Sequence, residues 1–412
     1  MIGKIAWRNL WRNKTRTSIV IIAISLSYGM MLWLFGVADY SYQEMGDATV
    51  EAVGGHLLVH GEGYWDLPTG GQVVSDATER REYIEAMPQV EAVAERVIGF
   101  GLLGTADATE GGQLLGVRPD DEAAFFDVSD RLVEGAFFSG ERDMPVVISE
   151  DVADTLAVGI GDRVVVTGSR VDDGEVTRGL FFVDGIYRGG AGETGEGRAF
   201  TRLEDLQEVL GYGDGVTQLG LRLYDESLRN QIARALRDDF DDFDLEVLTW
   251  DEAVPELVAL IEFDQAFTYI YVLIIMIIVV LGITNTLLMA VLERVREIGL
   301  FSALGLTPRG IGLMIIVETA MVTAVAMAIG FALGFSGHLW MVEYGIDLGE
   351  MADIEFEFSG VSMDMLVIHS YLDPVRWTVG TLVIFGFICL SAIYPAWRAS
   401  RMAPAEAMRF YE

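Results

Sequence analysis

Four segments of the chain carry almost no charge over lengths that cross a bilayer, and this feature limits the possible folds more than any other. The segments are 17–38, 266–292, 310–337 and 377–397. A helix rises about 1.5 Å per residue, so 21 residues or more span a hydrocarbon core of about 30 Å. We therefore expect four transmembrane helices. The first is interpreted as a retained anchor, because it exceeds a signal-peptide core in length and no A-x-A cleavage site follows it.

Basic residues lie beside the ends of these segments and set the expected orientation. Residues 1–16 hold five Lys or Arg and no acid, which under the positive-inside rule places the N-terminus in the cytoplasm. Basic residues recur there every four positions opposite an apolar arc, which predicts an interfacial helix along the inner leaflet. Four crossings return the tail at 398–412 to the cytoplasm, where the turn at 293–309 also lies. We expect a multi-pass protein of the cell (inner) membrane with both termini cytoplasmic.

Segment 39–265 is then extracytoplasmic, and its composition differs from that of the rest of the chain. It holds 49 Asp or Glu and 16 Arg but no Lys, and so carries nearly all of the formal net charge of −34. A cationic ligand is one explanation, and a solvated acidic surface suited to high salt is the other. We favour the second, because the acids are scattered and because a screening length of about 3 Å at molar salt weakens their repulsion. The source is thus expected to be a halophile.

The same segment has the pattern of a mixed α/β domain. Strands are predicted at 56–59, 97–103, 113–117, 179–187 and 217–223, and helices at 78–87 and 226–236. Within 146–166 we expect two strands around a short helix that Ser149 begins and that Gly159 and Gly161 end. Thr201 and Glu204 are interpreted as a capping box before a helix at 206–210.

Two further features of the sequence concern how this domain is held. From Trp250 a helical pattern continues through Pro255 into the second apolar segment, which predicts a helix that crosses the membrane surface without a break. The single cysteine, Cys389, lies in the fourth apolar segment, so the domain must be stable by core burial without an intramolecular disulfide. A second acidic extracytoplasmic loop is expected at 338–376.

The sequence lacks the usual motifs that bind nucleotides or metals. A P-loop needs lysine after glycine, and neither Lys4 nor Lys14 follows a glycine, so ATP-driven work requires a partner and no cofactor is expected in this chain. His56 and His60 have the spacing of a helical metal pair, but their glycine-rich and β-branched context favours a strand. About 13 Å then separates the imidazoles, too far to share one zinc ion. No catalytic residue, metal site or nucleic-acid partner is predicted.

Polar residues within the apolar segments are few. Glu318 is the one acid among them, and an ionisable group in a membrane is a functional-site hypothesis by default. It lies about 12 Å from the inner end of its helix, where water or Arg309 could satisfy it, so we favour a structural role. Gly330 and Gly334 form a G-x-x-x-G, and Asn285 belongs to a polar cluster, which both favour close helix packing.

The charged, helix-prone turn at 293–309 lies between two apolar segments and is too short to fold unless it packs against another part of the protein. With the rest of the chain it resembles the permease subunits of the MacB/LolC/LolE/FtsX superfamily of ABC transporters. The matching stretches are A-W-R-N-L-W-R-N-K-T-R-T (6–17), G-G-H-L-L-V-H (54–60), V-V-I-S-E-D-V-A-D-T-L-A-V-G-I-G-D (146–162), E-R-V-R-E-I-G-L-F-S-A-L-G (293–305) and Y-P-A-W-R-A-S-R-M-A-P-A-E-A-M-R (394–409).

This resemblance implies an α-helical membrane protein with four transmembrane helices and a MacB-like periplasmic core domain between the first two. It implies pairing with a second permease, identical or not, above a cytoplasmic LolD/MacB-like ATPase dimer that binds ATP and Mg²⁺. The turn at 293–309 would be the coupling helix that docks on this ATPase. The residues carried over to that role are Glu293, Arg294, Arg296, Glu297, Gly299, Ala303, Leu304 and Gly305.

The resemblance also implies mechanotransmission, in which closure of the inner ends moves the outer domain. The start of the outer domain and its size are more similar to LolC and LolE, which release lipoproteins from the membrane, than to FtsX. Lipoprotein or similar hydrophobic cargo would then enter between the first two spans. The alternatives are MacB-like export of peptides or drugs and FtsX-like regulation of a cell-wall hydrolase, and a membrane enzyme is disfavoured because no catalytic constellation is present.

Overall fold

The structure, a computed structural model, describes residues 14–65, 72–126, 131–188, 197–240, 243–347, 357–358, 361–362 and 367–401. The interfacial helix expected over 1–16 and the tail expected over 398–412 lie almost entirely outside these residues. The chain divides into two compact units. A helical unit comprises Met1–Gln43, Leu260–Met351 and Met365–Glu412, and an α/β unit comprises Glu44–Ala259 and Ala352–Asp364.

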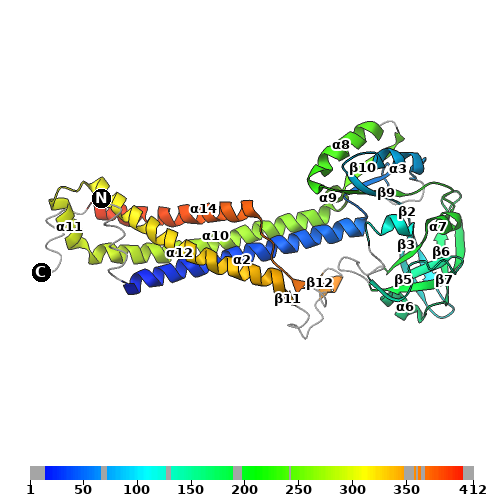
Figure 1. Ribbon diagram of the computed structural model, residues 1–412, viewed down its shortest axis with the longest axis horizontal. Coiled ribbons are helices and arrows are strands. Elements are labelled where there is room, and N and C mark those ends of the chain that lie inside the picture. The colour runs from blue at the N-terminus through cyan, green and yellow to red at the C-terminus, as the bar shows by residue number, and fades with distance from the viewer. Residues whose placement is uncertain are drawn as a thin grey trace. The chain divides into compact units, whose positions relative to one another are not determined.

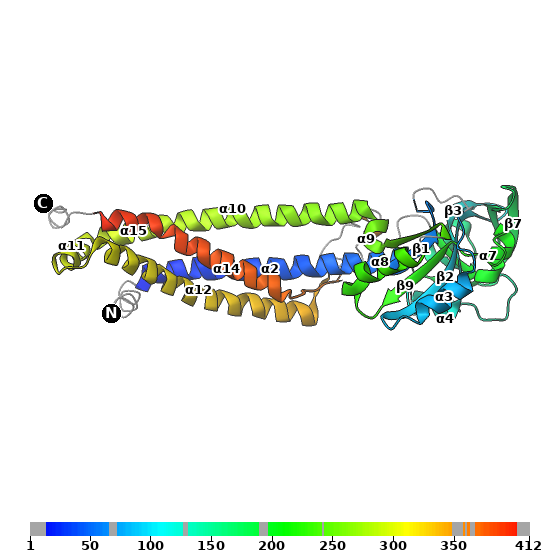
Figure 2. The ribbon, with the colours of Figure 1, turned by 90° about the horizontal axis from the view of Figure 1, so that it is seen from above.

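Long apolar helices make up the helical unit. They are α2 (Lys14–Val53), α10 (Pro255–Glu293), α12 (Pro308–Tyr344) and α14 (Pro374–Ser391). The shorter α11 (Val295–Ala303) lies between α10 and α12, and α15 (Ile393–Ser400) follows α14. Among the described residues, four helical stretches are long and apolar enough to cross a membrane, with mean hydropathies of 2.0 to 2.8. Figure 1 and Figure 2 show the four long helices alongside one another, with α11 at one end. The prediction of four membrane helices is confirmed.

Small residues bring the backbones of α2 and α12 together. A Cβ atom added to Gly330 would lie 2.6 Å from the carbonyl oxygen of Ser25, and one added to Gly334 would lie 2.8 Å from that of Gly29. The Ser25 hydroxyl also donates a 2.7 Å hydrogen bond to the carbonyl oxygen of Ala326. The G-x-x-x-G of the sequence therefore packs directly on the first helix. Asn285, by contrast, is exposed on α10.

The α/β unit contains a ten-stranded sheet. Its strands are β1 (Leu57–Gly61), β2 (Val90–Gly104), β3 (Thr109–Val117), β4 (Leu132–Gly135), β5 (Pro145–Ser149), β6 (Arg163–Ser169), β7 (Val176–Tyr187), β8 (Gly197–Arg202), β9 (Gln218–Leu223) and β10 (Leu245–Thr249). The strand order is β10-β1-β9-β2-β3-β8-β5-β7-β4, with β6 paired to β2 and β7. Most pairs are antiparallel, whereas β3 with β8 and β5 with β7 are parallel.

Short helices accompany this sheet. They are α3 (Ala77–Glu85), α4 (Pro119–Glu122), α6 (Glu150–Leu156), α7 (Leu203–Leu210), the 3-10 turn η1 (Glu226–Leu228), α8 (Arg229–Phe240) and α9 (Trp250–Ala253). Apolar residues of α3, α6, α7 and α8 join those of the strands in one continuous core. The predicted mixed α/β domain is thus confirmed. Outside it, two-stranded pairs are formed by β11 (Ile346–Asp347) with β14 (Val367–Ile368) and by β12 (Glu357–Phe358) with β13 (Val361–Ser362).

Three local predictions are wrong, each for a backbone reason. Thr201 belongs to β8 and donates a 2.9 Å hydrogen bond to the carbonyl oxygen of Pro145, so it does not cap α7, which begins after Arg202. Helix α6 does begin at Ser149, but it ends at Ala157, which takes the left-handed conformation with φ 52° before either predicted glycine. The helix from Trp250 breaks at Val254, because a residue before proline is disfavoured in the α conformation.

Candidate functional site

The sharp turn between α10 and α12 forms helix α11, and local sequence signals bound it at both ends. Arg294, with φ −108° and ψ 18°, interrupts the helical path between α10 and α11. Gly305 then takes φ +97°, a conformation that favours glycine, and ends the turn. The Thr307 hydroxyl accepts a 3.2 Å hydrogen bond from the Gly310 amide, and Pro308 follows in the first turn of α12. These signals fix where α11 lies along the chain.

One face of α11 is buried against the neighbouring helices. Val295, Ile298 and Gly299 have little exposed surface. Ile298 belongs to an apolar cluster with Val291 of α10, residues of α12 and α15, and the partly buried Leu306. Burial of one such aliphatic side chain stabilises by about 1.5–3 kcal/mol. The helix is therefore held in place by packing, and Gly299 lies on its inner side.

The opposite surface of α11 is exposed and mixes charge with aliphatic side chains. The exposed residues between positions 293 and 305 are Glu293, Arg296, Leu300, Ala303, Leu304 and Gly305. Leu300 and Leu304 expose 57% and 77% of their surface and lie four residues apart, so they share one side of the turn. Leu300 was missed by the sequence analysis, although an apolar residue one turn before Leu304 is the pattern that reveals it. Glu297 is only partly exposed.

An ion pair joins the α10–α11 junction to α12. Arg294 Nη1 lies 2.9 Å from Glu318 Oε1, and the two side chains are 13% and 18% exposed. Glu297 and Phe301 help to line a small cavity of about 40 Å³ beside this pair. Arg309, which the sequence analysis named as a partner for Glu318, is exposed. The break at Arg294 allows its side chain to reach α12, and sequence spacing alone does not reveal this contact.

The opposite end of the helical unit carries a second pair, which the sequence analysis missed. Asp39 of α2 and Arg376 at the start of α14 form an ion pair. Both lie one residue outside the predicted apolar segments, so Asp39 was assigned to the extracytoplasmic domain and Arg376 to the second extracytoplasmic loop. Each lies at the edge of an apolar segment, but no spacing in the sequence links the two residues. Nearby, the Tyr42 hydroxyl donates a 2.6 Å hydrogen bond to Asp264 Oδ2.

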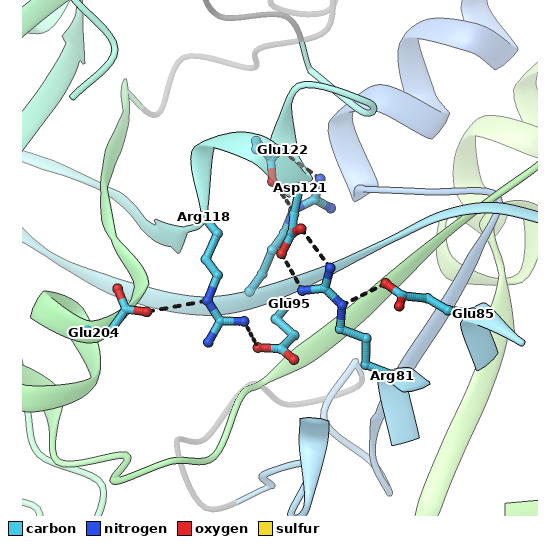
Figure 3. Close-up of polar contacts among 8 residues, drawn as sticks. Arg81, Glu85, Glu95, Arg118, Asp121, Glu122 and Glu204 are labelled. Atoms are coloured by element: carbon cyan, nitrogen blue, oxygen red, sulfur yellow. Dashed lines mark hydrogen bonds and ion pairs between the residues drawn. The ribbon is translucent and has the colours of Figure 1, made fainter. Parts of the chain in front are cut away.

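Arginine–carboxylate contacts in the α/β unit account for part of its high content of acids. Arg81 donates to both oxygens of Asp121 at 2.5 and 2.7 Å and also to Glu85 at 2.7 Å. Figure 3 shows these contacts beside those that Arg118 makes with Glu95 and Glu204. The hydrogen bonds to Asp121 raise the pKa of the Arg81 guanidinium. These pairs link α3, α4 and β2.

A further pair in the same region is almost fully buried. Arg96 donates to the two oxygens of Glu122 at 2.8 and 2.7 Å, and the side chains are 2% and 3% exposed. Arg96 Nη1 also donates to the carbonyl oxygen of Gly54 at 2.6 Å. Gly54 itself has φ +99°, and an added Cβ would collide with the guanidinium. This contact fixes the chain as it enters β1.

The two histidines of H-L-L-V-H have separate partners, with His56 directly before β1 and His60 within it. His56 Nδ1 accepts a 3.0 Å hydrogen bond from the Leu223 amide, and His60 Nδ1 lies 3.0 Å from the carbonyl oxygen of Thr217. Burial lowers the pKa of His60 to about 4, so its imidazole is neutral at pH 7. Within the described part of the chain, no group of three His, Cys, Asp or Glu side chains is placed to hold a metal ion.

A mixed α/β domain placed after the first of four candidate membrane helices defines a multi-pass membrane protein with a large domain outside the bilayer. Residues 17–239 match the MacB-like periplasmic core domain, and residues 269–404 match the FtsX-like permease C-terminal domain. The chain belongs to the ABC transporter permease family that combines these two domains. Permeases of this family work with a cytoplasmic ABC ATPase partner, as the sequence resemblance implied.

Similarity to two LolC proteins and one MacB protein agrees with this assignment. The chain is 25% identical over 336 residues to the lipoprotein-releasing system transmembrane protein LolC of Xylella fastidiosa (strain 9a5c), covering 78% of each chain. It is 25% identical over 345 residues to LolC of Neisseria meningitidis serogroup B, covering 80% of each chain. A shorter match, 33% over 129 residues, covers 31% of this chain and 16% of the macrolide export ATP-binding/permease protein MacB of Rhodopirellula baltica.

Proposed function

We propose that this chain couples ATP hydrolysis by a separate cytoplasmic ATPase to motion of its α/β domain, and thereby extracts lipoproteins or similar hydrophobic cargo from the membrane. ATP and Mg²⁺ are held by the partner, and a second permease, identical or not, completes the transporter. Both chain termini and α11 face the cytoplasm, and the α/β domain faces the periplasm or the cell exterior. The similarity to two LolC proteins over about four fifths of the chain supports this choice of cargo.

The observation that carries the coupling role is the two-sided construction of α11. Its inner face packs against α10, α12 and α15, so a force applied to α11 reaches the membrane helices. Its outer face presents Arg296 for orientation-specific ionic contacts and Leu300 and Leu304 for apolar contact. An apolar centre with a polar rim is the usual anatomy of a protein–protein interface, and Arg is enriched there.

The test is reconstitution of the permease with the cytoplasmic ABC ATPase that co-purifies with it. In the variant Arg296→Glu with Leu304→Ser, we expect the membrane protein to fold but the ATPase to bind at least about tenfold more weakly. Arg234→Glu, an exposed change on α8 in the α/β unit, is the matched control and should bind the ATPase normally. Normal ATPase binding by the α11 variant would refute the docking role.

Orientation is tested in a Cys389→Ser background. A cysteine at position 304 should resist a membrane-impermeant thiol reagent in intact cells, whereas a cysteine at the exposed position 172 should react. The reverse pattern would overturn the proposed topology.

MacB-like export of peptides or drugs is the second candidate function, because the chain also matches part of a MacB protein. Proteoliposomes that contain the complex distinguish the two. ATP-dependent release of a triacylated lipoprotein supports extraction, whereas ATP-dependent transfer of a soluble peptide without lipoprotein release supports export. FtsX-like regulation would instead activate a cell-wall hydrolase while neither substrate moves.

A further inference from the structure

The last turn of α2 belongs to the α/β unit, and side chains of the sheet bind its carbonyl oxygens. The final carbonyl groups of a helix have no partner within the helix. Here Arg198 of β8 donates from Nη2 to the carbonyl oxygen of Ala52 at 2.8 Å. Gln218 of β9 donates from Nε2 to the carbonyl oxygen of Val53 at 3.0 Å. Two strands therefore hold two successive residues at the end of this helix.

A third strand binds the next residue of the chain through Arg96 of β2. Its Nη1 donates to the carbonyl oxygen of Gly54 at 2.6 Å, while its Nε and Nη2 donate to the two oxygens of Glu122. Hydrogen bonds from a charged donor are stronger than neutral ones, and a cation at the C-terminus of a helix also offsets the negative end of the helix dipole. We call residues 52–55, which these bonds tie to the sheet, the α2 joint.

Glycines allow the side chains to reach the α2 joint. A Cβ atom added to Gly54 would lie 1.6 Å from Arg96 Nη1 and 2.5 Å from Gln218 Nε2. One added to Gly220 of β9 would lie 2.1 Å from the carbonyl oxygen of Gly54. Gly54 also has φ +99°, a conformation that favours glycine. The first glycine of G-G-H-L-L-V-H is thus required for α2 to end directly against the sheet.

The connection from the sheet to α10 is built differently. The chain is held by the domain up to Ala253, because the Trp65 indole donates a hydrogen bond to the Ala253 carbonyl oxygen. Val254 then leaves the helical conformation, with φ −128° and ψ 63°, and α10 starts at Pro255, which has no N–H. Residues 255–259 are exposed or half-buried. We call residues 253–255 the α10 joint.

We propose that Arg96, Arg198 and Gln218 are positioning residues that keep the α2 joint rigid, and that the chain bends at the α10 joint. Hinges are usually a few residues at the ends of elements that absorb a change in backbone angles. The domain would then keep its angle to α2 and change its angle to α10 during the transport cycle. This inference rests on the proposed function, because it states which helix carries motion to the domain.

Hydrogen exchange of the full-length permease tests the α2 joint without nucleotide or ATPase. The amides of Gly54 and Gly55 both donate to the carbonyl oxygen of Val50, at 3.0 and 2.8 Å, so their exchange reports opening of the joint. In the variant Arg198→Gln with Gln218→Leu, we expect these amides to exchange about 5- to 30-fold faster, because two hydrogen bonds that hold the joint are lost. The buried arginine–glutamate pair beside the joint stays intact, which favours folding of this variant.

Two single variants complete this measurement. Arg198→Lys keeps a charged donor and should retain most of the protection from exchange. Arg178→Gln removes an arginine from an exposed position of β7 and should exchange like the unaltered protein. Unchanged exchange in the variant Arg198→Gln with Gln218→Leu would overturn the proposal.

Distances between spin labels test where the chain bends, in a Cys389→Ser background. Exposed positions 44 and 262 lie about two turns of helix from the α2 joint and the α10 joint, and each is paired with the exposed position 154 on α6. With the ATPase bound and ATP present without hydrolysis, we expect the 262–154 distance to change and the 44–154 distance to stay constant. Equal changes in both distances would contradict a rigid α2 joint.

Cargo release separates a positioning role from a purely structural one. The variant Arg198→Gln with Gln218→Leu should bind the ATPase and hydrolyse ATP normally, but release at least about fivefold less cargo per ATP. Normal release, despite faster exchange at the α2 joint, would show that these residues do not position the domain. If ATP moves neither label pair in the unaltered complex, the proposed function itself fails, whereas hydrogen exchange still decides whether these residues hold the α2 joint.

Discussion

Replacing Glu318 with alanine removes the carboxylate that lies 2.9 Å from Arg294 at the α10–α11 junction. Breaking a fully buried ion pair costs about 3–5 kcal/mol. Because the two side chains retain 13% and 18% exposure, solvent screens part of this loss, and we expect about 1–3 kcal/mol. The Arg294→Gln variant should lose a similar amount.

A double-mutant cycle isolates the pair from other effects of each change. The double variant should be destabilised by less than the sum of the single variants, with a coupling energy of about 1–3 kcal/mol. The charge-swapped variant, Arg294→Glu with Glu318→Arg, should recover part of the stability. Arg296→Gln, an exposed change on α11, serves as the control and should change stability by less than about 0.5 kcal/mol. Unfolding of the purified permease in detergent supplies the free energies.

The same variants test the functional meaning of the pair. If α11 transmits force to α12 through this contact, Glu318→Ala should still bind the ATPase, but ATP hydrolysis should no longer release cargo from proteoliposomes. Additive single variants, or full cargo release by Glu318→Ala, would refute the reasoning.

Four other perturbations address separate parts of the fold. Gly330→Leu forces a side chain where the Ser25 carbonyl oxygen lies 2.6 Å away, so α2 and α12 should separate and the melting temperature should fall by an amount equivalent to about 1–3 kcal/mol. Glu122→Ala removes one partner of a buried pair with Arg96 and should cost about 3–5 kcal/mol in denaturant unfolding. The His60 pKa, lowered to about 4 by burial, means that the unfolded chain binds more protons between about pH 6.5 and 4. His60 should therefore contribute stability that is full above pH 6.5 and falls by about 3 kcal/mol as the pH drops to 4, and His60→Gln should flatten that dependence. Lowering salt from molar to dilute should reduce the melting temperature of the α/β unit within the full-length protein, and a value independent of salt would contradict the halophile hypothesis.

The membrane helices and the class of the domain were predictable because both depend on local composition and periodicity. Uncharged apolar segments long enough to cross a bilayer predict membrane helices, and alternating apolar residues such as those of 217–223 predict strands. The position of α11 was also predictable, since Gly305 and Pro308 bound it. The four-residue spacing of Gly330 and Gly334 likewise predicted close helix packing.

Long-range pairs were not predictable, because no spacing rule connects them. Asp39 and Arg376 are 337 positions apart, and only the fold brings α2 and α14 together. The inward location of Gly299 depends on tertiary packing. The break at Val254 follows from Pro255, which the sequence prediction treated as compatible with a continuous helix. Thr201 likewise matched a helix cap, but pairing of β8 with β5 extended the strand through it.

The contact of α2 with α12 divides the membrane helices by how freely each can move. Carbonyl oxygens of α2 occupy the space in which side chains of α12 would stand, so sliding one helix along the other brings larger residues into collision. Helix α10 is different, because only 11% of its most apolar stretch is buried within the chain, compared with 44% for α2 and 39% for α12. Separating α10 from the other helices therefore exposes little new surface. Within a single chain, the motion that costs least would keep α2 and α12 as one rigid body and let α10 swing.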